Sequence, residues 1–187
     1  IGTTETAIDS RRNVVRTEEA TMGNLIADAQ LNATRGAGAQ MAFMNPFGIR
    51  APLVPGPDGG LTFGDIYQCQ PFGNNVVTVT MTGAQIKATL EQGLDDTGPK
   101  QALAPSAGFA FRFDPARPAG DRIVSITLDG MPLDMASPYR VTVNGFLALG
   151  GDGFSGFAGM PDAVTGATDI DARDGAFRYP AFTRIVA

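Results

Sequence analysis

The spacing of apolar residues changes along the chain, and this change constrains the fold more than any other sequence feature. An early segment has apolar residues at helical spacing, namely Met22, Leu25, Ile26, Ala29 and Ala33. Further along, Phe109, Phe111 and Phe113 alternate with other residues, as the inward side chains of a half-buried strand do. Helices first alternate with strands, and strands then follow one another. This order indicates an α+β domain with mixed sheets and flanking helices, not a doubly wound parallel sheet.

Capping residues set the expected starts of the helices. We expect the first helix to follow an N-cap at Thr17, with Glu18-Glu19 complementing its N-terminus. Thr62 is a candidate cap for a short helix over 61–68. Thr82, followed three residues later by a glutamine, has the pattern of a capping box for a third helix.

Short apolar runs bounded by turn residues predict the strands, which we expect over 41–44, 76–81, 109–113, 123–128 and 139–144. Asp129-Gly130 is a hairpin turn signal. The chain has 187 residues, and we expect one domain over 1–187. Within it, 1–13 is expected to be a linker or leading strand, and 156–187 a C-terminal extension.

The charged and metal-binding residues limit the chemistry that the chain can perform. The net charge is −5 and there is no histidine. A sequence-independent nucleic-acid partner needs a basic face, so we expect none. Histidine is the commonest general base and metal ligand, so we expect neither a catalytic residue nor a metal site in this chain. No run of about 18 apolar residues occurs, and we therefore expect no membrane segment.

Three loops that follow predicted strands or helices carry residues suited to binding: Asn45 to Arg50, Pro71 to Asn74, and Phe146 to Phe154. An asparagine can bind the edge of a heterocycle, and an arginine can bind phosphate or vicinal hydroxyls. Two phenylalanines, Phe72 and Phe146, could form a slot for a planar base. A single phenylalanine at a strand end belongs to the core more often than to a ligand site, so the combination carries the argument.

Two other features suggest sites that the sequence does not support. Gly150 to Gly153 is glycine-rich, but it lacks the lysine of a Walker phosphate loop and the oxygen ligands of an EF-hand. Cys69 has no histidine to activate it as a nucleophile, and we expect it to be a small buried apolar residue.

Taken together, five segments resemble the C-terminal domain of the 5'-nucleotidase family, in order and spacing, from about Val14 to about Phe154. The segments are Arg16-Thr17-Glu18-Glu19 with Met22-Gly23-Asn24-Leu25 and Asp28-Ala29, Asn45 to Arg50, Pro71-Phe72-Gly73-Asn74, Met81-Thr82-Gly83, and Asn144 to Phe154. The family includes periplasmic nucleotidases that also hydrolyse UDP-sugars and the cell-surface enzyme that converts AMP to adenosine. The resemblance implies a layered α/β/β/α domain that holds the nucleoside or nucleotide.

The resemblance also implies roles for single residues. The base would stack between Phe72 and Phe146, and Asn45 would bind its edge. The ribose or phosphate would be reached by three further side chains, Arg16, Arg50 and Asp152. Asn74 matches a position that contacts ligand in some members. One residue departs from the common Asn-x-Gly-Gly-x-Arg loop: Phe47 replaces the first glycine. Its side chain either extends the aromatic slot or narrows it.

In this family an N-terminal metallophosphatase domain with two divalent metal ions performs the hydrolysis, and that domain is absent from these 187 residues. The resemblance thus implies that the chain binds substrate without catalysing its hydrolysis, and that the parent protein is periplasmic or secreted. Three alternatives stay open within related enzymes: a cyclic-nucleotide phosphodiesterase, a UDP-sugar hydrolase and a thiosulfohydrolase. A stand-alone nucleoside-binding module is a fourth.

Overall fold

The computed structural model describes residues 2–4, 7–8, 19–96, 101–168 and 185–186. A five-stranded sheet has the order β10 (Val164–Thr168), β4 (Asn75–Thr82), β9 (Pro138–Asn144), β2 (Met41–Met44) and β5 (Ala104–Pro105). A four-stranded sheet has the order β11 (Ile185–Val186), β6 (Phe109–Phe113), β7 (Ile123–Leu128) and β8 (Met131–Pro132). β1 (Gly2–Thr3) pairs with β3 (Gly60–Leu61). The larger sheets each contain parallel and antiparallel pairs, so the predicted mixed α+β class is confirmed.

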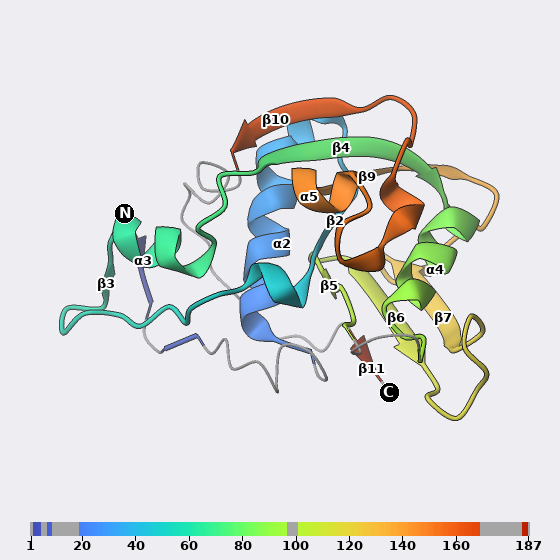
Figure 1. Cartoon of the computed structure of the whole chain (residues 1–187), viewed down its shortest axis with the longest axis horizontal. Helices are drawn as coiled ribbons and strands as arrows, with labels where there is room; N and C mark the ends of the chain where they lie inside the picture. Colours follow the sequence, from blue (N-terminus) through green and yellow to red (C-terminus); the bar gives the residue numbers. More distant parts are fainter. Residues whose placement is uncertain (1, 5–6, 9–18, 97–100, 169–184, 187) are drawn as a thin grey trace.

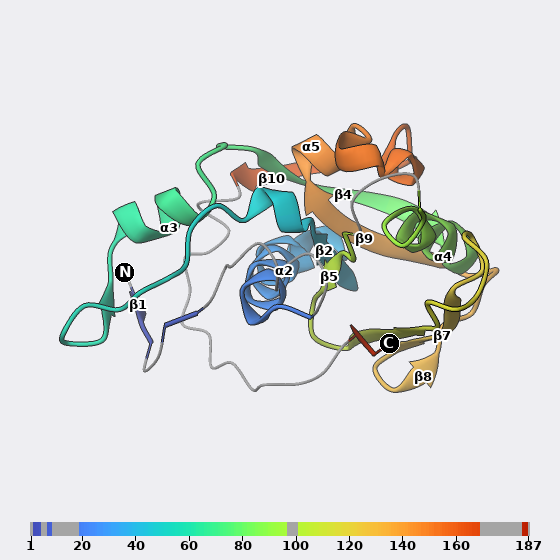
Figure 2. The ribbon, with the colours of Figure 1, turned by 60° about the horizontal axis from the view of Figure 1, so that its bottom comes forward.

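Helices flank the sheets. The α-helices are α2 (Thr21–Thr34), α3 (Phe63–Cys69), α4 (Gly83–Gln92) and α5 (Gly145–Ala148). Short 3-10 turns are η1 (Arg35–Ala37), η2 (Pro46–Gly48), η3 (Gly151–Gly153) and η4 (Ser155–Phe157). Figures 1 and 2 both place α3 at one end of the molecule and α4 at the other. None of the helices in the described ranges combines the length and hydrophobicity that crossing a bilayer requires.

Strand β2 separates two hydrophobic clusters, because successive side chains of a strand point to opposite faces of the sheet. Met41 and Phe43 belong to a cluster that α4, β6 and β7 also line. Met44 belongs to a second cluster, with Ile26 of α2 and Cys69. The layers are therefore α2, the five-stranded sheet, and then the four-stranded sheet with α4. Cys69 is 1% exposed, which confirms its predicted place as a buried apolar residue.

The helix starts test the predicted caps. Thr62 caps α3 with Asp65, and Thr82 caps α4 with Gln85, so both predictions are confirmed. The prediction for the first helix is wrong in its start: α2 begins at Thr21 after Ala20, which has no capping side chain. Glu19 instead accepts a hydrogen bond from the Asn24 side chain, 2.6 Å away. The expected cap, Thr17, lies outside the described residues.

The remaining strand predictions are confirmed to within a residue or two. Asp129 and Gly130, at φ of 50° and 78°, form the two-residue turn between β7 and β8. Such a turn requires positive φ at both positions, which asparagine, aspartate and glycine tolerate best. β10 lies in the segment expected as an extension, where it pairs with β4 at the edge of the sheet.

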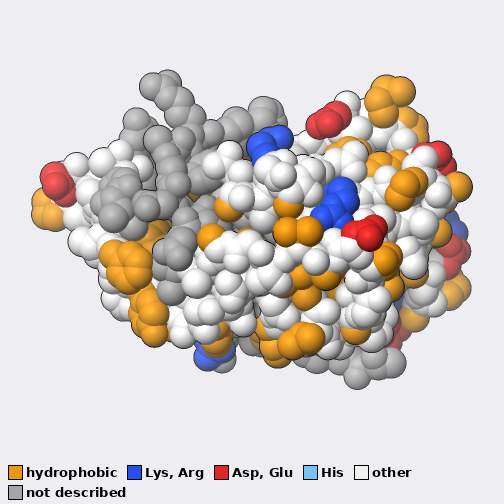
Figure 3. Space-filling view, turned by 90° about the horizontal axis from the view of Figure 1, so that it is seen from above, with side chains coloured by type: hydrophobic (Ala, Val, Ile, Leu, Met, Phe, Trp, Pro, Cys, Tyr) orange, Lys and Arg blue, Asp and Glu red, His pale blue; other side chains and the backbone are white. Residues whose placement is uncertain are grey.

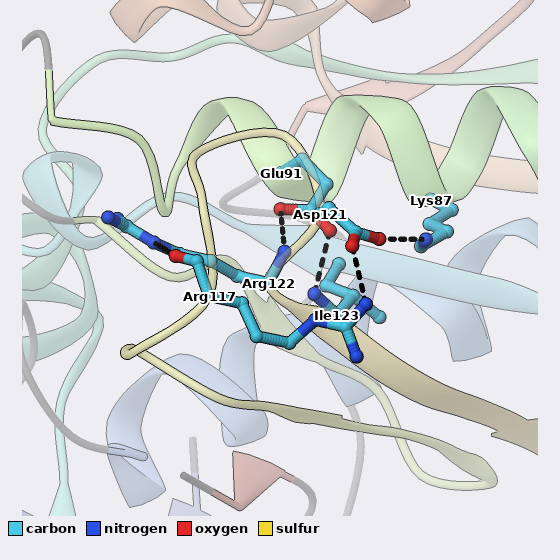
Figure 4. Close-up of polar contacts among 6 residues, drawn as sticks. All are labelled: Lys87, Glu91, Arg117, Asp121, Arg122 and Ile123. Carbon is cyan, nitrogen blue, oxygen red and sulfur yellow. Dashed lines mark hydrogen bonds and ion pairs between the residues drawn. The ribbon is translucent and has the colours of Figure 1, made fainter.

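A buried carboxylate ties α4 to the start of β7 (Figure 4). Glu91 is 4% exposed and accepts hydrogen bonds from the backbone N–H groups of Arg122, at 3.0 Å, and Ile123, at 2.7 Å. The Arg122 guanidinium, also buried, pairs with Asp96 at 2.8 Å. Lys87, one turn before Glu91 on α4, forms a surface ion pair with Asp121, the residue that precedes Arg122. This cluster anchors α4 at the end of the molecule away from α3.

Candidate functional site

The sheet topology brings the three predicted loops to one edge. β2 and β9 are parallel neighbours, so the residues that follow them, Asn45 and Gly145, emerge at the same edge. β4 runs antiparallel to β9, with Val76 opposite Asn144, so β4 begins where β9 ends. The turn that precedes β4 therefore meets the other two loops. Segments about a hundred residues apart in the sequence form one site for this reason.

These loops enclose a pocket of about 330 Å³. Its lining residues are Met44, Asn45, Phe47, Gly48, Arg50, Gln70, Phe72, Asn74, Asn144, Phe146 and Asp152. Six predicted site residues are thus brought together: Asn45, Arg50, Phe72, Asn74, Phe146 and Asp152. The seventh, Arg16, lies outside the described residues.

Two phenylalanines of the pocket wall expose much of their rings. Phe72 is 48% exposed and Phe146 is 46% exposed, although a large apolar side chain is usually buried. Phe72 comes from the turn before β4, and Phe146 from α5. The Arg50 guanidinium lies over the Phe72 ring, 5.7 Å from its centroid, within reach of a cation–π contact. The pocket therefore offers aromatic surface and a cation close together.

A chain of three hydrogen bonds runs along the polar wall. The Leu147 backbone N–H donates to Asn144 Oδ1 at 2.9 Å, and Asn144 Nδ2 donates to Asn45 Oδ1 at 2.9 Å. Asn45 Nδ2 then donates to Asp152 Oδ2 at 2.6 Å. Asn45 and Asn144 are 2% and 3% exposed. Burial makes such contacts costly to break, so this wall has a defined geometry.

The backbone around Asp152 holds its carboxylate toward Asn45. Asp152 has a φ of 54°, which is uncommon for a residue with a Cβ, and it lies between Gly150 and Gly153, at 86° and 84°. The Gln101 side chain donates to the Asp152 carbonyl oxygen. Strained residues of this kind cluster at functional sites.

Sequence reasoning missed two polar residues of the pocket, Asn144 and Gln70. Asn144 caps α5, a role that its place before Gly-Phe-Leu could have suggested. Gln70 is 1% exposed and donates through Nε2 to the Met44 sulfur at 3.2 Å. Its Oε1 has no hydrogen-bond partner in the described part of the chain. No sequence pattern marks such a residue, because its burial depends on the tertiary structure.

Phe47 and Gly48 form the part of the wall beside Asn45. Phe47, the departure from the common loop, is half-buried and lines the pocket. Gly48 packs so tightly that a Cβ there would lie 3.0 Å from Asn45 Oδ1 and would collide with the Met44 side chain. This glycine is required for the close approach.

The pocket lining contains few charged or metal-ligating side chains. Within the described ranges, no three histidine, cysteine, aspartate or glutamate side chains group in a way that could hold a metal ion. The donor set of the pocket, amides and one carboxylate, does not fit a two-metal centre, so we place no hydrolytic step here. On the face in Figure 3, basic side chains occur singly and lie among acidic ones, not as a continuous basic surface.

Comparisons with known proteins show the family of the chain. The family model described as "5'-nucleotidase, C-terminal domain" matches residues 1–159. The trifunctional nucleotide phosphoesterase protein YfkN of Bacillus subtilis is 37% identical over 164 residues, which cover 84% of this chain and 11% of that protein. A 5'-nucleotidase of Vibrio cholerae is 31% identical over 165 residues, which cover 88% of this chain and 28% of that protein.

A solved structure matches the whole fold. The 5'-nucleotidase precursor from Thermus thermophilus has a TM-score of 0.88 and 35% identity, covering 100% of this chain and 39% of that one. This chain thus spans well under half the length of these relatives. The family match over most of the chain, the shared fold and the sequence identity lead to one conclusion: the chain belongs to the 5'-nucleotidase C-terminal domain family.

Proposed function

We propose that this chain is the substrate-binding domain of a 5'-nucleotidase-type metallophosphohydrolase, and that its pocket holds a nucleoside or nucleotide. The observation that carries the proposal is the pairing of two exposed phenylalanines, Phe72 and Phe146, with a buried amide and a carboxylate in one pocket. Aromatic stacking contributes about 1–3 kcal/mol per base. Asn45 would bind the base edge, and Asp152 would accept hydrogen bonds from ribose hydroxyls.

Cationic side chains would complete the site. Arg50 lines the pocket beside Phe72 and would reach the ribose or phosphate. Arg16, which lies outside the described residues, is proposed for the same part of the ligand. Asn74 is proposed as a further contact. The location of Phe47 in the wall supports a role in selecting among ligands.

Hydrolysis would take place elsewhere in a larger protein. We propose a partner N-terminal metallophosphatase domain, with two divalent metal ions that activate water for attack on the phosphoric ester. This chain would supply binding and orientation. Residues 1–187 would form one domain, with a linker or leading strand over 1–13 and an extension over 156–187. The parent protein would be periplasmic or secreted.

The main alternative is a thiosulfohydrolase. The sulfate thiohydrolase SoxB of Thermus thermophilus has a TM-score of 0.71 and 19% identity, so it shares the fold. A thiosulfohydrolase has no use for a base-stacking slot, so the exposure of Phe72 and Phe146 favours a nucleotide ligand.

The test is calorimetric titration with adenosine, AMP, uridine and UDP-glucose, on the wild type and on Phe72→Ala/Phe146→Ala. Phe63→Ala is the matched control, because Phe63 is 55% exposed on α3 and is not among the pocket residues. We expect saturable binding that the double variant loses and the control retains. No binding to the wild type, or equal binding to the double variant, would contradict the proposal.

A further inference from the structure

The hydrogen-bond chain from the Leu147 backbone N–H to the Asp152 carboxylate can run with donors and acceptors in only one order. The Leu147 end shows the first reason. The Leu147 backbone N–H can only donate, so the atom of Asn144 that faces it must be Oδ1. The Nδ2 of Asn144 then faces Asn45 and donates to Asn45 Oδ1. The orientation of an asparagine amide is normally ambiguous, but here a backbone donor determines it.

The other end of the chain gives the same answer independently. A carboxylate only accepts hydrogen bonds, so the Asn45 atom that faces Asp152 must be Nδ2. That choice again leaves Asn45 Oδ1 toward Asn144. Two fixed ends, one a donor and one an acceptor, thus permit a single orientation of both amides.

This orientation decides what Asn45 offers to the pocket. Its Oδ1 is engaged by Asn144 and lies against Gly48. Its Nδ2 carries two hydrogens, and one of them is donated in the hydrogen bond to Asp152. No second acceptor for Nδ2 occurs among the contacts of the described residues, and Asn45 lines the pocket. The side chain therefore presents an N–H group to a ligand, not a carbonyl.

We propose that Asn144 is a positioning residue that fixes Asn45 as a hydrogen-bond donor, so that the pocket favours a base that presents a hydrogen-bond acceptor to it, such as an unprotonated ring nitrogen of a purine. The inference rests on the proposed nucleoside ligand and adds the polarity of one contact. Asn144 acts through Asn45 and through its cap of α5, and does not itself need to touch the ligand.

A reciprocal exchange of two residues can reverse the chain. In Asn144→Asp/Asp152→Asn, the new amide at position 152 donates to Asn45 Oδ1, Asn45 Nδ2 donates to the new carboxylate at position 144, and Leu147 N–H still has its acceptor. Every contact is satisfied and the net charge is unchanged, but the N–H of Asn45 no longer faces the same way. Asn144→Asp alone keeps a good N-cap. In either orientation of the Asn45 amide, however, Asn45 Oδ1 then faces a carboxylate, so two acceptors lie against each other.

The stability measurement compares four proteins: the wild type, Asn144→Asp, Asp152→Asn and the reciprocal double variant. We expect Asn144→Asp to lower the melting temperature, and the further change Asp152→Asn to recover part of that loss. The carboxylate buried at position 144 is common to both, so its cost cancels. Additive effects of the two substitutions, with no recovery, would overturn the fixed direction of the chain.

The binding arm uses adenosine with 1-deaza-, 3-deaza- and 7-deazaadenosine, each of which lacks one ring nitrogen. We expect one analogue to bind the wild type about tenfold more weakly than adenosine, the usual effect of one lost hydrogen bond. Asp152→Asn is the matched control: it loses the carboxylate but keeps the direction of the chain, so the penalty persists. In the reciprocal variant the penalty disappears.

The outcomes separate this inference from the proposed function. Wild-type protein that binds none of the nucleosides overturns the proposed function, and with it the preference for a base that presents an acceptor to Asn45. Wild-type protein that binds adenosine but shows no penalty with any deaza analogue overturns only the inference. A penalty that survives in the reciprocal variant shows that Asn144 does not set the direction of Asn45, and overturns it as well.

Discussion

Gly151 lies directly against the ring of Phe146: a Cβ added at position 151 would stand 2.6 Å from the ring atom Cζ and nearer still to two others. No real Cβ makes such a contact, so the position of this pocket ring depends on a bare backbone beside it. Gly151→Ala should displace the ring and weaken adenosine binding about tenfold, within the range of one lost stacking contact. Calorimetric titration measures the change. Gly36→Ala, where a Cβ meets open space, should leave the affinity unchanged.

Gln70→Leu should stabilise the fold and weaken nucleoside binding. The buried Oε1 of Gln70 has no partner in the described residues, and leaving such a group unsatisfied costs about 1–3 kcal/mol. The leucine variant should therefore raise the free energy of unfolding by about 1 kcal/mol and weaken nucleoside binding several-fold. Gln30→Leu is the control, because Gln30 is also buried with an unpartnered Oε1 but lies outside the pocket. Equal loss of affinity in both variants would show that the loss at Gln70 does not arise from its place in the pocket wall.

Glu91→Gln should destabilise the fold without affecting the pocket. The Glu91 carboxylate accepts two backbone N–H groups, and an amide can accept only one of them while its NH₂ faces the other. We expect the free energy of unfolding in urea to fall by about 1–3 kcal/mol, with nucleoside affinity retained. Lys87→Ala, which removes an exposed ion pair from the same helix, should change stability by less than about 1 kcal/mol. A large loss in the lysine variant would show that the surface pair, not the buried carboxylate, anchors α4.

Asp65 should titrate at a lower pH than an ordinary aspartate does. Hydrogen bonds from the Thr62 side chain and backbone hold the pKa of the Asp65 carboxyl below its ordinary value. A depressed pKa means that this contribution to stability is present above the unfolded-state pKa and is lost as the pH falls through the folded-state value. Carboxyl NMR titration should give this low midpoint, and Thr62→Ala should raise it. Thr82→Ala, at the other capping box, should leave it where it is.

Much of the fold could be predicted from local patterns. The capping boxes at Thr62 and Thr82 and the turn at Asp129-Gly130 depend on neighbouring residues, so the sequence predicts them well. The sequence does not predict β10, because its residues Val164–Thr168 are largely exposed and gain their structure from pairing with β4. The start of α2 differs from the one that the caps predict: Glu19 lies outside the helix and accepts a hydrogen bond from the Asn24 side chain.

The site divides in the same way. Residue type and motif order predict six described residues that line one pocket, and their roles as ligand contacts stay predictions. The place of Gln70 and the direction of the Asn45 amide were not predictable, because both depend on partners from distant parts of the chain. Asn45 lies 99 residues from Asn144 and 107 from Asp152.

These long separations also bear on how the protein folds. The pocket forms only after β2 has paired with β9 in parallel register. This pairing closes a loop of about a hundred residues, and its entropic cost makes it a late step in folding. Helices such as α4 and the β7–β8 hairpin can form from local contacts long before that step. Recovery of ligand binding during refolding would thus report completion of the central sheet, whereas helical circular dichroism would rise earlier.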